Sequence, residues 1–152
     1  MPSKSNNPEI LQLIHQDHEE VQGLFEQFQK SVSAKNGEKK ADAISKQICD
    51  DLKLHTELEE KIVYPSLKEQ DAKIFYEAGE EHHVVDLLIA ELQQLKVSAP
   101  EYAAKMSVME ESVKHHIQEE ESQMFKLITQ LPDDTLDKMA EEWKSQKQHA
   151  QK

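Results

Sequence analysis

Apolar residues recur along this chain in alternating steps of three and four, which is the spacing of one face of an α-helix. Over residues 9–34 the series is unbroken: Leu11, Ile14, His18, Val21, Phe25, Phe28 and Val32. The chain has only 3 Gly and 5 Pro among 152 residues, so few positions interrupt a helix. The pattern therefore predicts an all-α protein.

The same spacing recurs in three further stretches, so four long helices are expected. We predict them over residues 9–34, 38–64, 71–96 and 98–131. Asn36-Gly37 is a turn sequence after the first helix. Pro65 is expected to end the second helix, because the residue before a proline is pushed out of the helical conformation. Four long helices with short links favour an up-down-up-down four-helix bundle.

The division of the chain follows from these elements. We expect a polar N-terminal tail over residues 1–8, the bundle over residues 9–131, and a C-terminal helix and tail over residues 132–152. Leu136, Met139 and Trp143 stand at helical spacing and predict a short extra helix in the last segment. A chain of 152 residues is long enough to bury a single core.

Charge and composition narrow the partners and the compartment. The net charge of -12 argues against nucleic acid or an anionic membrane surface as the main partner. The sequence has no apolar run near the length of a membrane span, and its start, MPSKSNNPEI, lacks the apolar stretch of a secretory signal. The single cysteine, Cys49, fits a reducing compartment and is expected to be a small buried hydrophobe. We expect a cytoplasmic monomer or dimer.

Ionisable residues stand at positions of the apolar series where the core is expected. They are His18 in the first helix, His55 and Glu59 in the second, His82 in the third, and His116 and Glu120 in the fourth. In the second and fourth helices the His and the Glu are four residues apart, so both side chains lie on one helix face. The chain thus repeats one pattern twice, which predicts that these residues share one layer of the core.

Two carboxylates in an apolar layer are costly unless they are paired or bind a metal. Hydrogen-bonded His–Glu networks are the structural alternative, but the doubled pattern favours two metal ions bridged by the glutamates and capped by the histidines. Imidazole and carboxylate suit iron, manganese and zinc alike. Six protein ligands on two ions leave a position open on each ion, where a small molecule can bind.

The neighbouring ionisable residues have plainer interpretations. His15, His83 and His115 flank the series and are expected to point partly to solvent. Glu60, Glu119 and Glu121 are expected to form a solvated face, with Glu121 as an alternative to Glu120. A ferritin-like site would need two Glu-x-x-His pairs, and only Glu80-x-x-His83 is present.

Four segments, in this order, resemble the four helices of hemerythrin-like proteins, the HHE cation-binding domain: DHEEVQGLF, HTELEEKIVYP, EHHVVDLLIAEL and HHIQEEESQMF. The resemblance covers about residues 9–131 and implies a non-haem diiron centre held by the six residues named above. It favours His82 over His83 and His116 over His115. Oxygen-carrying members have a further His where this chain has Asp86, and an Asp where it has Glu121, so both stay open as alternative ligands.

The resemblance also implies a function. We expect a protein that binds or reacts with dioxygen, peroxide or nitric oxide, in a stress response. The symmetric His–Glu pattern is similar to the diiron domain of bacterial iron-sulfur repair proteins, so iron storage, sensing or delivery is the alternative. No flavin or iron–sulfur motif is visible as an electron source, and whether the protein is an enzyme stays open.

Overall fold

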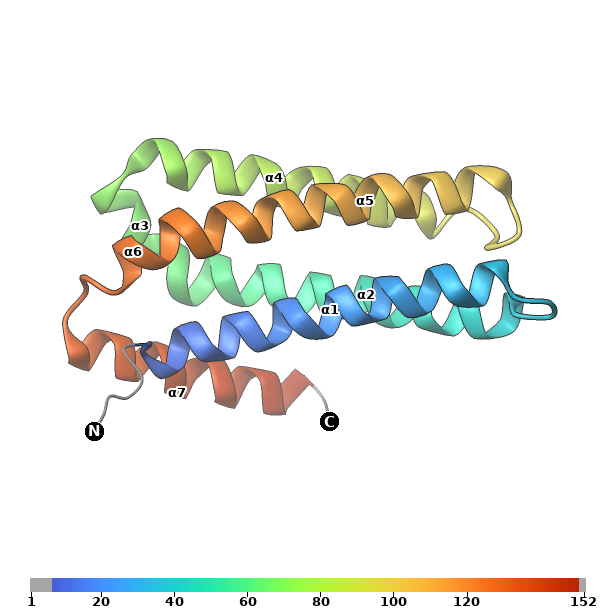
Figure 1. Cartoon of the computed structure of the whole chain (residues 1–152). Coiled ribbons are helices and arrows are strands. Elements are labelled where there is room, and N and C mark those ends of the chain that lie inside the picture. The colour runs from blue at the N-terminus through green and yellow to red at the C-terminus, as the bar shows by residue number, and fades with distance from the viewer. Residues whose placement is uncertain (1–6, 151–152) are drawn as a thin grey trace.

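The structure, a computed structural model, describes residues 7–150, and these residues are helical with short connections (Figure 1). The helices are α1 (Glu9–Ser33), α2 (Glu38–Leu58), α3 (Tyr64–Gln70), α4 (Ala72–Leu92), α5 (Pro100–Glu119), α6 (Phe125–Ile128) and α7 (Asp133–Ala150). Two π-helical turns, η1 (Glu59–Val63) and η2 (Glu120–Met124), follow α2 and α5. No strand occurs among the described residues, so the all-α prediction is confirmed.

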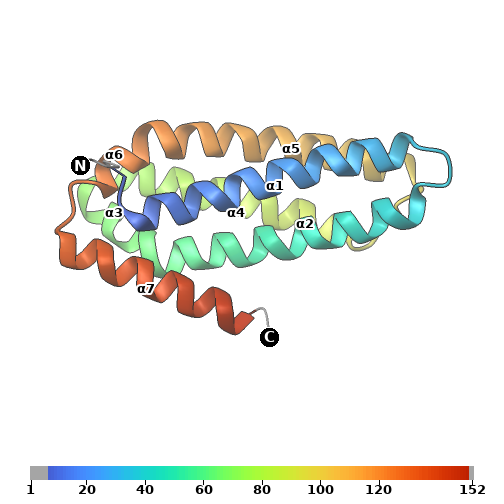
Figure 2. The same ribbon diagram turned by 60° about the horizontal axis from the view of Figure 1, so that its bottom comes forward.

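The four long helices lie alongside one another as two hairpins (Figures 1 and 2). Helix α1 contacts α2 and α5, α4 contacts α5, and α2 contacts α4. The connections α1–α2 and α4–α5 lie at one end of the molecule, and α3 and α6 lie at the other end (Figure 1). Each long helix therefore faces the interior shared by all four.

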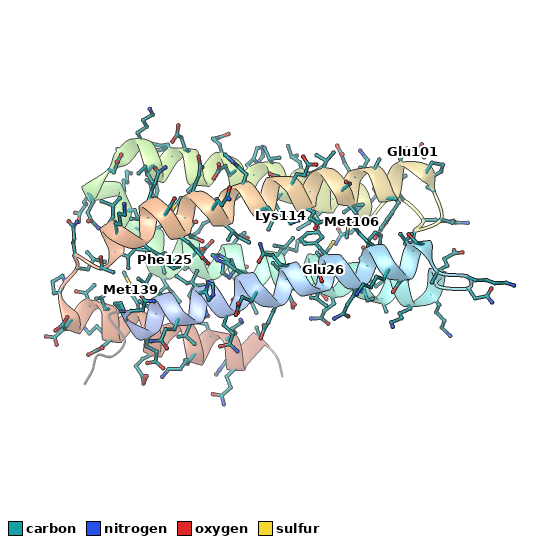
Figure 3. The ribbon with its side chains drawn as sticks, in the orientation of Figure 1. Glu26, Glu101, Met106, Lys114, Phe125 and Met139 are labelled. Atoms are coloured by element: carbon teal, nitrogen blue, oxygen red, sulfur yellow. The ribbon has the colours of Figure 1, made fainter. Side chains whose placement is uncertain are left out.

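A polar layer divides the buried apolar core into two clusters. One cluster includes Phe25, Ile48, Ile89 and Met106, and the other includes Ile10, Leu58, Ile128 and Met139. Met106 and Met139 lie toward opposite ends of the molecule in Figure 3. His18, His55 and His82 each stand between residues of the two clusters along their helices. His18, for example, follows Ile14 of one cluster and precedes Val21 of the other.

The second helix extends beyond its predicted end, and the second and fourth helices each contain a π-helical turn that was not predicted. The prediction that Pro65 ends the second helix and that an irregular stretch follows is wrong. The helix continues through η1 into α3 and ends at Gln70. Pro65 lies in the first turn of α3, where its missing N–H is tolerated. The fourth helix continues in the same way through η2 and α6. The π-helical turns begin at Glu59 and Glu120, two of the predicted site residues.

The C-terminal helix α7 has 18 residues, longer than the short helix expected. Its Leu136, Met139 and Trp143 are buried, as their spacing predicts. The helix packs against α1, α2 and η1, along the outside of the first hairpin (Figure 2). The predicted N-terminal tail, residues 1–8, lies mostly outside the described residues, and the division of the chain into three parts stays a prediction.

Cys49 is buried in the first core cluster, as expected of a small apolar residue. Burial raises the pKa of its thiol to about 11, so the thiolate is scarce near neutral pH. Among the described residues, no helix combines the length and apolarity needed to cross a membrane.

The turn between α1 and α2 generates a stability prediction. Asn36 adopts a positive φ of 62°, and a Cβ on Gly37 would overlap the carbonyl group of Ser31. We expect Gly37→Ala to lower the melting temperature, because the end of α1 must shift to make room. Gly79→Ala in α4, where a Cβ meets nothing within 4 Å, should instead stabilise the protein by about 0.5–1 kcal/mol. Thermal unfolding followed by circular dichroism measures both, and equal melting temperatures would contradict the prediction.

Candidate metal centre

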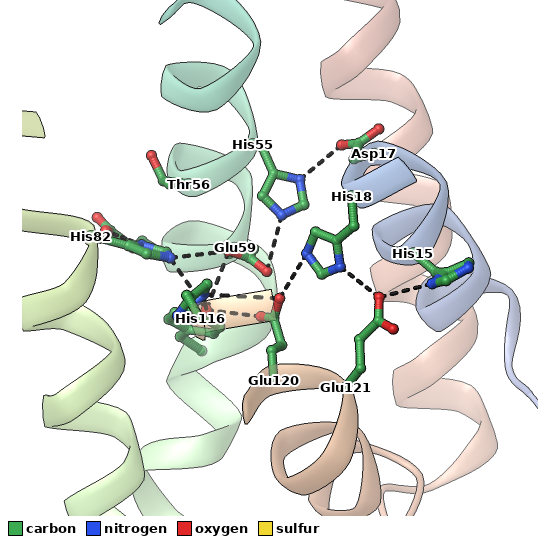
Figure 4. A network of polar contacts seen from close by, with 12 residues as sticks. His15, Asp17, His18, His55, Thr56, Glu59, His82, His116, Glu120 and Glu121 are labelled. Carbon is green, nitrogen blue, oxygen red and sulfur yellow. Dashed lines mark hydrogen bonds and ion pairs between the residues drawn. The ribbon is translucent and has the colours of Figure 1, made fainter. Parts of the chain in front are cut away.

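The structure brings all six predicted site residues together in one buried layer (Figure 4). His18 comes from α1, His55 from α2, Glu59 from the start of η1, His82 from α4, His116 from α5, and Glu120 from the start of η2. Both glutamates are fully buried, at 0% exposure. The layer thus contains two carboxylates with no access to bulk water.

Each glutamate lies between histidines of different helices. Glu59 Oε2 lies 3.2 Å from His55 Nε2, and Glu59 Oε1 lies 3.1 Å from His82 Nε2. Glu120 Oε1 lies 2.9 Å from His18 Nε2 and 3.9 Å from His116 Nε2. The two oxygens of Glu59 therefore face two separate histidines, as a bridging carboxylate would.

The donor atoms form two groups that share Glu59. His18, His55, Glu59 and Glu120 bring ligand atoms within 4.8 Å of one another, and Glu59, His82 and His116 do the same. In the first group, His18 Nε2, His55 Nε2, Glu59 Oε2 and Glu120 Oε1 are buried without a hydrogen bond of acceptable geometry among the described residues. Their close N···O separations of 2.9 and 3.2 Å match neighbouring ligands of one ion. Ligands about 2.1 Å from an ion and at right angles lie about 3 Å apart. The residues therefore fit metal ions.

Four further carboxylates hold the outer nitrogen of each histidine. Their oxygens accept hydrogen bonds from Nδ1 as follows: Glu121 from His18 at 2.7 Å, Asp17 from His55 at 2.8 Å, Glu60 from His82 at 2.7 Å, and Glu81 from His116 at 2.6 Å. With the proton on Nδ1, the lone pair of each Nε2 points into the layer. The outer carboxylates thus orient all four imidazoles as ligands.

Sequence reasoning missed this outer set. Glu60 is exposed, as expected of a solvated face, but it also holds His82. For Glu121 the expectation is wrong, because its side chain is only 27% exposed and it holds His18. The available signal is that each outer carboxylate is next in sequence to an inner residue. Glu60 follows Glu59, for example, and Asp17 precedes His18. Sequence adjacency does not reveal the partner, because that partner lies on a different helix.

The alternative ligands lie outside both donor groups. Asp86 is exposed and belongs to neither group. Glu121 Oε2 accepts hydrogen bonds from Nδ1 of both His15, at 2.8 Å, and His18. His83 and His115 are exposed, as expected.

Tyr64 is a site residue that the sequence did not predict. Its hydroxyl donates to Glu120 Oε2 at 2.8 Å and to Glu59 Oε1 at 3.2 Å, and it lies 3.1 Å from His116 Nε2 and 3.3 Å from His82 Nε2. Burial raises the pKa of Tyr64 well above its usual value, and the charges of Glu120 and Glu59 raise it further. The phenol therefore stays protonated and acts as a hydrogen-bond donor.

The π-helical turn η1 explains why Tyr64 reaches the site. In an ideal α-helix each residue rotates by about 100°, so residues nine apart, such as His55 and Tyr64, lie on opposite sides. A π-helical turn contains an extra residue, and the Tyr64 N–H here bonds to the Glu59 carbonyl five residues earlier. The extra residue rotates Tyr64 back toward the face that carries His55 and Glu59.

The titration behaviour of the layer reflects two close carboxylates. Burial raises the pKa of Glu120, and the charge of nearby Glu59 raises it further. Burial also acts to raise the pKa of Glu59, but His55 and the other hydrogen-bonding partners outweigh it and hold that pKa well below its usual value. Burial lowers the pKa of His55, but Glu59 and Asp17 outweigh this effect and raise it to about 10. Such a layer favours positive charge between its carboxylates.

The outer carboxylates generate a testable difference between two adjacent residues. We expect Glu81→Gln to lower the affinity for cobalt(II) or iron(II) by about 10-fold or more, because a neutral amide makes His116 less basic. Glu80→Gln changes an exposed neighbour on the same helix and should leave the affinity unchanged. Competition with a chelating dye measures both constants, and equal affinities of the two variants would argue against the role of Glu81.

Comparison with known proteins agrees with the geometry. The profile of the Hemerythrin HHE cation binding domain family matches residues 9–128. A solved hemerythrin HHE cation binding domain-containing protein from Mycobacterium kansasii has the same fold, with a TM-score of 0.74 and 21% identity over 90% of this chain and 84% of that one.

A curated protein from Nostoc sp., named DNA nickase, is 28% identical over 98% of this chain and 42% of its own length. The chain thus spans less than half of the length of that relative. The family profile matches most of the chain, and the buried His/Glu layer is of the kind that binds metal ions. The protein belongs to the hemerythrin HHE cation-binding domain family.

Proposed function

We propose that this protein is a non-haem diiron protein with an up-down-up-down four-helix bundle that binds or reacts with dioxygen, peroxide or nitric oxide. The observation that carries the proposal is the pair of buried donor groups joined through Glu59, one of which contains four polar atoms without acceptable hydrogen bonds. Orphaned polar atoms at full burial are costly, and a bound cation removes that cost.

The two donor groups support a division of the ligands between two ions. His18 and His55, with Glu59 Oε2 and Glu120 Oε1, would hold one ion, and His82 and His116, with Glu59 Oε1, would hold the other. Manganese and zinc also suit these donors, and the family resemblance favours iron. When bound, the iron pair would supply Lewis acidity and exchange electrons with a small oxidant.

The chain's own residues prepare the layer for that chemistry. The outer carboxylates lock the imidazoles in one orientation, which lowers the reorganisation needed on metal binding. Apolar side chains stand beside the layer, among them Val21, Leu52, Val85 and Val113, and they favour a small molecule of low polarity over bulk water. Tyr64 places a neutral hydroxyl donor beside Glu120, and its proton would be available to a small ligand if the hydroxyl released Glu120.

A role in storing, sensing or delivering iron is the second candidate. The observation that favours it is the contact of α7 with the layer. The ring centroids of Trp143 and His55 lie 5.4 Å apart. Metal occupancy would then change how tightly α7 and the hairpins pack. Helicity and melting temperature that are unchanged by chelation would remove the basis of this alternative.

The activity in the name of the Nostoc relative, DNA nicking, is not proposed for this chain. The relative extends well beyond the matched part, because 42% of its length is covered. The 30 acidic and 18 basic residues of this chain would also repel a phosphate backbone. We propose small oxidants as ligands, and a stress response as the setting for their reaction.

The first experiment is metal analysis of protein purified from iron-replete cells, with visible spectroscopy before and after addition of peroxide or nitric oxide. We expect two irons per chain and a spectrum that responds to the added ligand. Glu59→Ala should lose most of the metal, because Glu59 belongs to both donor groups. Glu80→Ala, an exposed change on α4 outside both donor groups, should retain it.

Three outcomes separate the candidates. Catalytic loss of the added oxidant, abolished in Glu59→Ala, would make the protein an enzyme. A stoichiometric spectral change without turnover would make it a binding protein. Absence of metal, with no uptake of added iron(II), would overturn the diiron proposal.

Tyr64 generates a separate prediction. We expect Tyr64→Phe to keep its iron but to bind or consume the small ligand up to about 10-fold less well, because one hydrogen bond contributes about 0.5–1.5 kcal/mol. Tyr76→Phe is the matched control, since Tyr76 is 57% exposed and is not part of the buried layer. Stopped-flow titration of the iron-loaded variants with nitric oxide measures the effect. Identical ligand affinities for Tyr64→Phe and the wild type would show that the hydroxyl does not contact the ligand.

A further inference from the structure

A cavity of about 710 Å³ connects exposed residues of the surface with the buried layer. Its inner end includes His18, His55, Glu59 and His116. Its outer part is lined by residues of α1, α2 and the end of α7. Since one water molecule takes about 30 Å³ of liquid volume, this space is large enough to hold a cation together with several water molecules.

The inner end of the cavity presents the unsatisfied donor group. His18 Nε2, His55 Nε2 and Glu59 Oε2 are three of the buried atoms without an acceptable hydrogen bond, and all three residues line the cavity. His82 of the second donor group is not among the lining residues. The cavity therefore borders three residues of the first donor group and, through Glu59 and His116, two residues of the second.

The outer part of the cavity has an excess of negative charge. Its acidic residues are Asp17, Glu20, Asp50, Asp51 and Glu57. Its two lysines are Lys53 and Lys147. Walls of one sign attract ions of the other and can raise association rates by about 10- to 1000-fold. The cavity is thus charged for cations and against anions.

Lys147 contacts a carboxylate that holds one of the site histidines. Its ammonium group forms an ion pair with Asp17 Oδ1, while Asp17 Oδ2 accepts the hydrogen bond from His55 Nδ1 at 2.8 Å. The Asp17 side chain is 11% exposed, so few other partners can reach it. A lysine has a flexible stem and one point charge, and it can move aside when a metal cation competes for the carboxylate.

We propose that this cavity is the route by which divalent cations reach the metal centre, and that Lys147 slows their passage by neutralising Asp17. The proposal rests on the proposed function only in requiring that the layer binds metal. The family profile ends at residue 128, so the lysine that closes the route lies on a helix outside the matched domain. Metal loading is therefore controlled by a part of this chain that the family match does not include.

The test is the rate at which metal-free protein takes up cobalt(II), followed by stopped-flow absorption. Lys147→Gln removes the ammonium group and keeps a side chain of similar size. We expect its initial uptake rate to rise about 10-fold at low ionic strength, and this gain to shrink in high salt. The final amount of bound cobalt should equal that of the wild type, since Lys147 belongs to neither donor group.

Two further variants make the comparison specific. Lys144→Gln removes a lysine on the same helix that pairs with Glu9 and Glu141 instead of a cavity residue, and it should load at the wild-type rate. Asp51→Asn removes one negative charge from the cavity wall and should load more slowly. Circular dichroism of each variant before mixing checks that the helices are intact.

The outcomes separate this proposal from the proposed function. Equal uptake rates in Lys147→Gln, Lys144→Gln and the wild type would overturn the route and leave the metal centre in place. Slow uptake in Glu119→Gln alone would overturn it too, because Glu119, with Glu81 and His115, forms a donor cluster away from this cavity. No cobalt uptake by the wild type would overturn the metal centre itself.

Discussion

The burial of Glu59 and Glu120 between two apolar clusters is the constraint on which the rest of this structure depends. Two carboxylates at 0% exposure cannot both remain charged without positive charge beside them. The four histidines supply polar partners, but four atoms of one donor group have no hydrogen bond of acceptable geometry among the described residues. The layer therefore weakens the core unless cations complete it, and metal binding and helix packing become parts of one equilibrium.

The outer carboxylates join the helices into a closed ring around that layer. Asp17 of α1 holds the α2 histidine, Glu60 after α2 holds the α4 histidine, Glu81 of α4 holds the α5 histidine, and Glu121 after α5 holds the α1 histidine. Each of the four long helices, with the π-helical turn that follows α2 or α5, supplies one histidine and one outer carboxylate to this ring. The orientation of each ligand thus depends on the position of its neighbouring helix, so the geometry of the site and the register of the hairpins are set together.

The two sides of the layer have different surroundings. Tyr64 contacts the side that contains His82 and His116. Trp143 of α7 contacts His55 on the other side, and Lys147 contacts Asp17, which holds His55. Phe125 follows His116 by nine residues, as Tyr64 follows His55. Phenylalanine has no hydroxyl group, so the repeated pattern supplies only one phenol.

The sequence by itself determined the long helices, the six residues at core positions and their meeting in one layer, because helical periodicity is local and records which residues face the core. Only the tertiary structure decided the rest. Tyr64 reaches the site because a π-helical turn shifts the helix phase, which α-helical spacing cannot show. The partners of Asp17 and Glu60 lie on other helices. The contact of α7 with His55 likewise depends on where α7 packs against α1 and α2. These features arise from the rotation and register of packed helices, and no spacing within one helix encodes them.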